Sequence, residues 1–196
     1  PLVFPDVEGL DSFAGPAFHT AAWRDDVDLT GKKVAIIGNG ASCMQIGPEI
    51  QDQVEHLTIF QKSNHWAAPF EQFRKPVPDP MRFLFREVPN YQAWYRVRLG
   101  WTFNDRTYAA LHKDPNWEHP ERSLNAQNDA HRAYFTKYIQ SELGDRQDLF
   151  DKVLPTYPPF GKRMLMDNGW YRMLRNPKVE LVTERVTKVE PDALVA

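Results

Sequence analysis

A short apolar run that ends in a glycine-rich turn constrains the fold of this chain more than any other feature. Residues 33–37, Lys-Val-Ala-Ile-Ile, are followed by Gly38-Asn39-Gly40. A β-branched run closed by glycine is typical of a fully buried strand in a parallel sheet. Residues 41–52 then have the apolar spacing of a helix, and Leu57–Phe60 is a second apolar run. The sequence therefore predicts a strand–turn–helix–strand unit at the beginning of an α/β domain.

The glycine turn suits one kind of ligand. Gly38 and Gly40 allow a tight turn and let the backbone approach a pyrophosphate at the N-terminus of the following helix. Cys43 stands where such turns usually have a third glycine, which brings helix and strand close together. The strand before the turn and the helix after it favour dinucleotide binding over an ordinary strand–helix connection.

The end of the second apolar run indicates which dinucleotide is bound. An NAD site usually has an acidic residue there, which bonds the ribose 2′-hydroxyl. Here the run ends in Phe60-Gln61-Lys62-Ser63, with a cation and a hydroxyl but no carboxylate. Lys62 would attract a 2′-phosphate, so we expect NADP(H), although an exposed strand-end lysine is the simpler alternative. The predicted cofactor-binding residues in this part of the chain are Gly38, Asn39, Gly40, Ala41, Ser42, Gln45, Lys62 and Ser63.

Composition narrows the class of protein. With 196 residues, of which 42% are hydrophobic, the chain is long enough for one domain that carries an insertion. A formal net charge of -2 with interspersed signs argues against a nucleic-acid or membrane partner. No apolar run approaches the roughly 20 residues of a membrane helix, no signal peptide is visible, and the single Cys43 excludes an internal disulfide, so we expect a cytoplasmic protein. No metal site is predicted, because His112, His119 and His131 lack metal-ligand spacing.

The chain divides into three kinds of sequence. Residues 1–30 lack regular periodicity and are predicted to be an interdomain linker. Residues 31–66 and 155–196 would form a Rossmann-like domain, with further strands at residues 179–182 and 186–189 and another beginning at residues 192–196. Residues 67–154 are aromatic-rich and helical in period, which predicts a helical insertion whose aromatic stripes form a core.

Three helices are expected in the insertion. The spacing of Met81, Leu84, Phe85 and Val88 predicts a short one. A second helix, interrupted near Gly100, is indicated by the aromatic residues Trp94, Tyr95, Trp101, Phe103 and Tyr108. The third would extend from Ala130 to Leu143, with Asn128 or Asp129 as its N-terminal cap and Gly144 at its end.

A segment upstream of the glycine turn resembles a family motif. Phe13-Ala-Gly15-Pro-Ala-Phe-His19-Thr20-Ala-Ala-Trp23 matches, position by position, the F-x-G-x-x-x-H-T-x-x-W motif of Baeyer–Villiger monooxygenases, which are class B flavin monooxygenases. The resemblance implies that His19 lies in the hinge that couples the flavin and nicotinamide domains and has a catalytic role. Without the resemblance, a lone histidine in a linker would be interpreted as structural. Arg24 departs from the family, which commonly has Pro or Asp at that position.

A second segment resembles the same family. Tyr157-Pro-Pro-Phe-Gly161-Lys162-Arg163 is similar to its Y-P-x-G-x-K-R segment, with the glycine in a slightly different position. The resemblance implies that Lys162 helps to hold the 2′-phosphate of NADP and that Arg163 is the catalytic cation over the flavin. Taken alone, the two residues would be interpreted as a solvated pair after a proline-rich loop.

The resemblance covers nearly the whole chain and implies its function. NADPH bound here would reduce FAD held by a separate domain that is absent from the chain, and the enzyme would convert ketones to esters or lactones with O2. The implied partners are a ketone, O2 and the FAD-binding domain of the same protein; a homodimer is a further expectation. Residues 19–45 resemble most closely the hydroxyacetophenone monooxygenase branch, which acts on aryl ketones. As an NADP-binding fragment, the chain alone is expected to be inactive.

Two alternatives remain open. Flavin-containing monooxygenases that oxygenate nitrogen or sulfur share the F-x-G-x-x-x-H part of the motif but lack its Thr-x-x-Trp ending, which Thr20 and Trp23 supply here. A non-catalytic NADP-binding module is the second alternative, because the chain has no FAD-binding motif. That alternative would leave Lys162 and Arg163 without a function.

Overall fold

The computed structural model describes residues 2–70 and 75–196. The contacts within the chain divide it into two compact units. The first unit consists of Pro1–His65, Ile139–Leu154 and Asp167–Ala196, and the second of Trp66–Tyr138 and Pro155–Met166.

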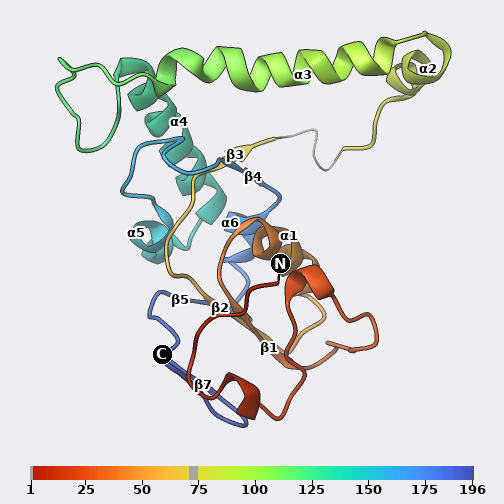
Figure 1. The fold of residues 1–196 in the computed structure, drawn as a ribbon, viewed down its shortest axis with the longest axis vertical. Helices are drawn as coiled ribbons and strands as arrows, with labels where there is room; N and C mark the ends of the chain where they lie inside the picture. Colours follow the sequence, from red (N-terminus) through yellow and green to blue (C-terminus); the bar gives the residue numbers. More distant parts are fainter. Residues whose placement is uncertain (1, 71–74) are drawn as a thin grey trace. The chain divides into compact units, whose positions relative to one another are not determined.

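A three-stranded parallel sheet is the framework of the first unit (Figure 1). Its strands are β1 (Lys33–Ile37), β2 (His56–Phe60) and β5 (Val179–Val182), in the order β1-β2-β5. Helix α1 (Ala41–Ile50) connects β1 to β2 and continues through Pro48. The predicted strand–turn–helix–strand unit is therefore confirmed.

The two faces of this sheet are buried to different extents. Leu57 and Ile59 are fully buried on the face toward α1, where a Cβ added to Gly47 would lie 2.9 Å from the sulfur of Met173 in α6 (Trp170–Met173). On the opposite face Ala35 is exposed. The prediction that residues 33–38 form a fully buried strand is wrong, because β1 alternates between half-buried and exposed positions.

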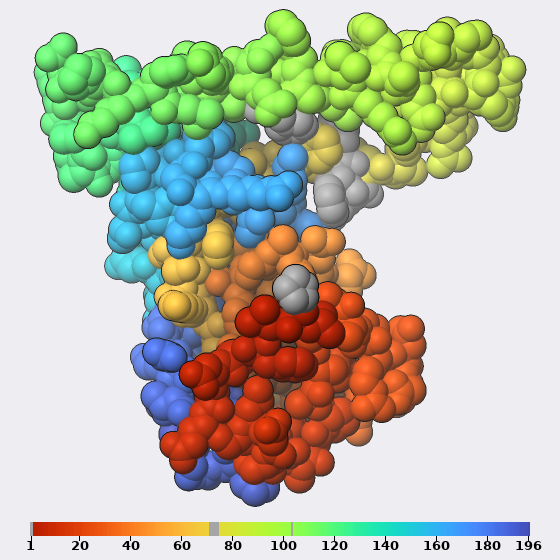
Figure 2. Space-filling model, in the orientation of Figure 1, coloured from red at the N-terminus to blue at the C-terminus, as the bar shows by residue number. Residues whose placement is uncertain are grey.

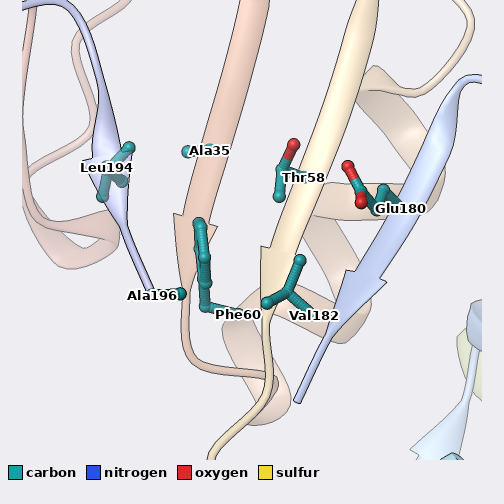
Figure 3. Close-up of a pocket in the computed structure, with 7 residues that line it drawn as sticks. All are labelled: Ala35, Thr58, Phe60, Glu180, Val182, Leu194 and Ala196. Atoms are coloured by element: carbon teal, nitrogen blue, oxygen red, sulfur yellow. The ribbon is translucent and has the colours of Figure 1, made fainter. Parts of the chain in front are cut away.

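The open face of the sheet contains a hollow (Figure 3). Each of the three strands contributes side chains to it, and the chain end contributes two residues. The lining residues are Ala35, Thr58, Phe60, Glu180, Val182, Leu194 and Ala196. None of the predicted site residues belongs to this set.

The N-terminal segment packs against a short hairpin at the other end of the sequence. The hairpin pairs β6 (Lys188–Val189) with β7 (Leu194–Val195) in antiparallel register. Phe60, Val186 and Val189 form a buried cluster, and residues of the segment, such as Phe13, pack against it. Two 3-10 turns, η1 (Leu10–Ser12) and η2 (Thr20–Ala22), are the regular elements of the segment, which lies along the surface of the unit in Figure 2 (red).

Two short helical elements complete the first unit. They precede the loop at residue 155 and are η5 (Gln147–Leu149) and α5 (Phe150–Val153).

The second unit is mainly helical. Its helices are α2 (Asp79–Glu87), α3 (Tyr91–Tyr108), η4 (Ala109–Leu111) and the first part of α4 (Ala126–Leu143). Strands β3 (Ala67–Pro69) and β4 (Leu165–Asp167) pair with each other, and only the last residue of β4 belongs to the first unit. The predicted interruption near Gly100 is wrong, since α3 is continuous; a glycine inside a helix costs about 1 kcal/mol but keeps its backbone N–H and C=O.

Helix α4 begins earlier than predicted. Asn125, just before it, accepts a hydrogen bond from the backbone N–H of Asn128 at 2.8 Å. The predicted caps Asn128 and Asp129 are therefore wrong, because both lie inside the first turn. Gly144, with φ of +58°, follows the last residue of the helix, as predicted.

The aromatic residues of α3 do not form the core that we predicted. Trp94, Trp101 and Tyr108 are 54%, 67% and 63% exposed. Tyr95 is half-buried and contacts Phe85 of α2, with ring centroids 5.3 Å apart. The side chain of Phe103 lies outside the described residues. None of the helices in the described ranges is both long and apolar enough to span a membrane.

Candidate functional site

The glycine turn between β1 and α1 has the backbone geometry that glycine permits. Gly38 has φ of +102°, a left-handed conformation that other residues rarely adopt. Its N–H donates to the carbonyl of Phe60 at 2.8 Å, which fixes the turn beside the end of β2. Gly40 is the N-terminal cap residue of α1, and no side chain in the described ranges caps that end of the helix.

Open space lies over the N-terminus of α1. A Cβ added to Gly38 or Gly40 would meet no atom within 4 Å. Ala41 and Ser42, the first two residues of the helix, are exposed. Uncapped N–H groups and the helix dipole favour an anion at such a helix end. The turn therefore fits the pyrophosphate of a dinucleotide, which would occupy the space that a Cβ would fill.

Three further predicted residues lie in the same unit. Gln45 is exposed on α1, and its Nε2 donates to the carbonyl of Ala41 at 3.1 Å. Lys62 and Ser63 are exposed directly after β2, the strand that pairs with β1. The carboxyl ends of parallel strands lie at one edge of a sheet. Lys62 and Ser63, which follow β2, therefore lie at the same edge as the glycine turn, which follows β1.

Asn39 differs from its neighbours, because its side chain is buried. It is 4% exposed, and its Nδ2 donates to Oε1 of Gln61 at 2.7 Å. Gln61, also 4% exposed, was missed by sequence reasoning as a site residue. The only signal was a polar residue immediately after the second apolar run.

Cys43 is a packing residue on α1. It is 3% exposed, and burial raises the pKa of its thiol to about 12. A helix N-terminus lowers a thiol pKa, but burial is the larger effect here. The thiol is therefore protonated and unreactive at neutral pH.

The upstream motif has a structural basis in the first unit. A Cβ on Gly15 would lie 2.8 Å from the ring of Phe13, which packs against the cluster around Phe60. His19 is half-buried, and its Nδ1 accepts a hydrogen bond from the N–H of Ala21 at 3.0 Å. The neutral imidazole therefore carries its proton on Nε2.

In the second unit, buried polar side chains hold the loop that precedes Lys162. The indole N–H of Trp66 donates to the carbonyl of Tyr157 at 2.9 Å. Asn128, fully buried on α4, donates to the carbonyls of Pro159 at 3.0 Å and Ala110 at 3.1 Å.

Arg132, one turn after Asn128, also holds this loop. Its guanidinium donates to the carbonyls of Pro155 at 3.3 Å and Tyr157 at 3.4 Å. It also lies over the ring of Trp66, 5.3 Å from the centroid. Burial is the main cause of its lowered pKa. Trp66, Asn128 and Arg132 were not predicted, because nothing in their sequence positions indicates that they contact this loop.

The loop contains a left-handed residue that is not glycine. Phe160 has φ of +67°. The family pattern Y-P-x-G-x-K-R places its glycine at this position, and the φ angle explains why glycine is favoured there. A bulky residue in this conformation is a genuine outlier, and such strain is concentrated at functional sites.

The loop ends at the predicted cations. The ammonium of Lys162 lies over the ring of Tyr157, 4.7 Å from its centroid. Arg163 is exposed, and its guanidinium has no hydrogen bond or ion pair with any residue in the described part of the chain. Its charge is therefore available to a ligand. Within residues 2–70 and 75–196, no group of three or more His, Cys, Asp or Glu residues could hold a metal ion.

The chain is similar to curated monooxygenases, although no protein-family model matches it. It is 56% identical over 187 residues to the uncharacterized monooxygenase y4iD of Sinorhizobium fredii, covering 95% of this chain and 28% of that protein. It is 33% identical over 194 residues to a Baeyer–Villiger monooxygenase of Streptomyces coelicolor, covering 98% of this chain and 34% of that protein. The chain thus spans about a third of the length of the curated relatives it matches.

Solved structures resemble the chain over nearly all its length. Cyclohexanone monooxygenase from Rhodococcus sp. Phi1 bound to NADP+ superposes with a TM-score of 0.76 at 25% identity, over 99% of this chain and 41% of that one. An oxidized steroid monooxygenase bound to NADP superposes with a TM-score of 0.73 at 26% identity, over 99% of this chain and 42% of that one. The predicted α/β fold is therefore confirmed.

Proposed function

We propose that the chain is the NADPH-binding part of a flavin-dependent Baeyer–Villiger monooxygenase, which converts ketones to esters or lactones with O2. The open glycine turn at the N-terminus of α1 carries this proposal, because a Cβ at Gly38 or Gly40 would fill the space that a pyrophosphate needs. The similarity to a Baeyer–Villiger monooxygenase of Streptomyces coelicolor supports the reaction class.

The cofactor-binding residues would divide the dinucleotide between them. Residues 38–42 would bind the pyrophosphate through backbone N–H groups, with Gln45 at the rim of the site. Lys62, Ser63 and Lys162 would bind the 2′-phosphate. Each lysine supplies a positive charge to the dianionic phosphate, and a charge-assisted hydrogen bond is stronger than a neutral one.

Catalysis would depend on Arg163 and His19. FAD, bound by another part of the full-length protein, supplies the chemistry that activates O2. A guanidinium cannot lose its proton in a protein, so Arg163 would be a permanent positive charge that stabilises negative charge on the reacting oxygen atoms. His19 would act in the hinge segment, where its Nε2–H is available as a donor.

The proposal also includes the division of the chain into domains and the class of substrate. Residues 1–30 would be the interdomain linker, residues 31–66 and 155–196 the Rossmann-like domain, and residues 67–154 the helical insertion. The likeness of residues 19–45 to the hydroxyacetophenone branch favours aryl ketones as substrates. The homodimer and the cytoplasmic location stay predictions.

The decisive test of the cofactor site is Gly40→Ala in the full-length protein. Gly40 has φ of -71°, which alanine adopts without strain. The added methyl group would fill the pyrophosphate space, so NADPH affinity should fall by at least about tenfold, or about 1.4 kcal/mol, while the melting temperature stays within a few degrees. Titration of NADPH fluorescence measures the affinity. Gly100→Ala is the control, because a Cβ there also meets no atom within 4 Å but lies on α3.

The reaction itself is tested by product analysis of the full-length enzyme with NADPH, O2 and an aryl ketone. An ester formed in proportion to NADPH consumed is the expected result. Oxygenation of amines or sulfides without ester would favour the nitrogen- and sulfur-oxygenating relatives. Binding of NADPH without any turnover would favour a non-catalytic module.

A further inference from the structure

A buried pair of amide side chains lies beneath the glycine turn. Asn39 and Gln61 are each 4% exposed, and Nδ2 of Asn39 donates to Oε1 of Gln61 at 2.7 Å. Nε2 of Gln61 donates in turn to the carbonyl of Lys152 at 2.7 Å, at the end of α5. The two bonds connect the turn after β1, the end of β2 and α5.

The position of Gln61 in the sheet relates this pair to the choice between NAD and NADP. Gln61 directly follows β2, and its backbone N–H donates to the carbonyl of Val182 in β5 at 2.7 Å. Dinucleotide-binding folds that select NAD place an acidic residue at about this point, where its carboxylate bonds the ribose 2′-hydroxyl. Here the side chain is a neutral amide that points inward and binds the glycine turn.

The hydrogen bonds of Gln61 exclude a carboxylate from this position. Its Nε2 is a donor to a backbone carbonyl, and an ionised glutamate has acceptors only. Glu at this position would place two acceptors 2.7 Å apart, and it would bury a negative charge beside the neutral amide of Asn39. The glutamate side chain would therefore have to turn outward, toward Lys62 and the open turn.

We propose that Gln61 is a specificity-determining residue for the cofactor. Its bond to Asn39 fixes the glycine turn, and its neutral, inward-facing amide keeps the end of β2 free of negative charge. The adjacent Lys62 and Ser63 are then left to bind a 2′-phosphate. This inference rests on the proposed NADPH-binding function of the turn.

The test compares the dissociation constants of NADPH and NADH for three variants of the full-length protein. Gln61→Glu should weaken NADPH by about tenfold or more, because a carboxylate beside the 2′-phosphate repels it, and should change NADH much less. Gln61→Met leaves Asn39 without its partner and adds no charge, so it should weaken both cofactors by a similar factor. Gln53→Glu is the control: it adds the same charge at an exposed position after α1 and should change neither.

The outcomes separate this inference from the proposed function. If the unmodified protein binds neither cofactor, both fail. If it binds NADPH but Gln61→Glu keeps the unmodified ratio of the two constants, the specificity inference is wrong while the proposed function stands. If Gln61→Glu does not fold, Gln61→Met decides: unchanged affinity for both cofactors would show that the amide pair does not fix the turn.

Discussion

The glycine turn of the first unit and the loop of residues 155–163 of the second unit are built in opposite ways. The turn consists of backbone and open space, and a Cβ at Gly38 or Gly40 meets nothing. The loop is held by buried side chains, of which Asn128 and Trp66 are 0% and 2% exposed.

The difference predicts how each region responds to mutation. Adding a side chain at the turn should weaken cofactor binding and leave the fold intact, because the space there is vacant. Truncating the side chains that hold the loop should destabilise it, because its carbonyl groups depend on donors from α4. The exposed cations Lys62, Lys162 and Arg163 should affect function without affecting stability.

The largest expected effect is that of Arg163→Ala in the full-length enzyme. Loss of one preorganised charge-stabilising donor should lower the rate of ester formation by about 10²–10³. NADPH affinity and melting temperature should change little, because the guanidinium has no bond to any residue in the described ranges. Arg96→Ala, at an exposed position on α3, is the control. A normal rate of ester formation would show that Arg163 is only a surface residue.

The second prediction tests the two lysines that are proposed to bind the 2′-phosphate. A charge-assisted hydrogen bond contributes about 1.5–3 kcal/mol, so Lys62→Ala and Lys162→Ala should each weaken NADPH by about 10- to 150-fold and barely change NADH. Calorimetric titration of the two cofactors measures this. Lys113→Ala, an exposed lysine of the second unit, should change neither. Equal losses for the two cofactors would mean that these lysines do not distinguish the 2′-phosphate.

The third prediction concerns the support of the loop. Asn128→Ala leaves the carbonyls of Pro159 and Ala110 without their donor, which should cost about 1–3 kcal/mol of the free energy of unfolding. Urea denaturation measures the cost. Asn116→Ala, at an exposed position, should cost less than about 0.5 kcal/mol. Equal costs would show that the loop does not depend on Asn128.

The smallest effect is expected at Phe160, and it is measured as a difference between two variants. Both Phe160→Gly and Phe160→Ala remove the ring contacts with His131 and Phe135. Only glycine also relieves the left-handed conformation, so the glycine variant should be more stable by about 1 kcal/mol. An alanine variant as stable as the glycine variant would show that φ of +67° is not strained.

The sequence predicts the glycine turn well because the turn depends on local properties. Glycines, β-branched runs and helical spacing are all visible within thirty residues, and β1, α1 and β2 follow from them. The contacts of Gln61 and Asn128 are different in kind. Each binds a carbonyl far away along the chain, at Lys152 and Pro159, and periodicity contains no information about such partners.

The errors in the insertion have a related cause. Apolar spacing shows that a helix has an aromatic face, but not whether anything covers that face. Trp94 and Trp101 therefore look like core residues in the sequence and are exposed in the structure. The same limit applies to β1, where a β-branched run suggested burial on both faces and Ala35 is exposed.

The separation of β2 from β5 has a consequence for how the chain folds. These strands are neighbours in the sheet, although residues 61–178 lie between them in sequence. The entropy lost in closing a long loop grows only slowly with its length, so this long connection costs little equilibrium stability. It slows folding, because non-local parallel pairing is slow. Until β5 is synthesised and pairs with β2, the edge of β2 that faces away from β1 stays unpaired. An unpaired strand edge is a template for aggregation during synthesis.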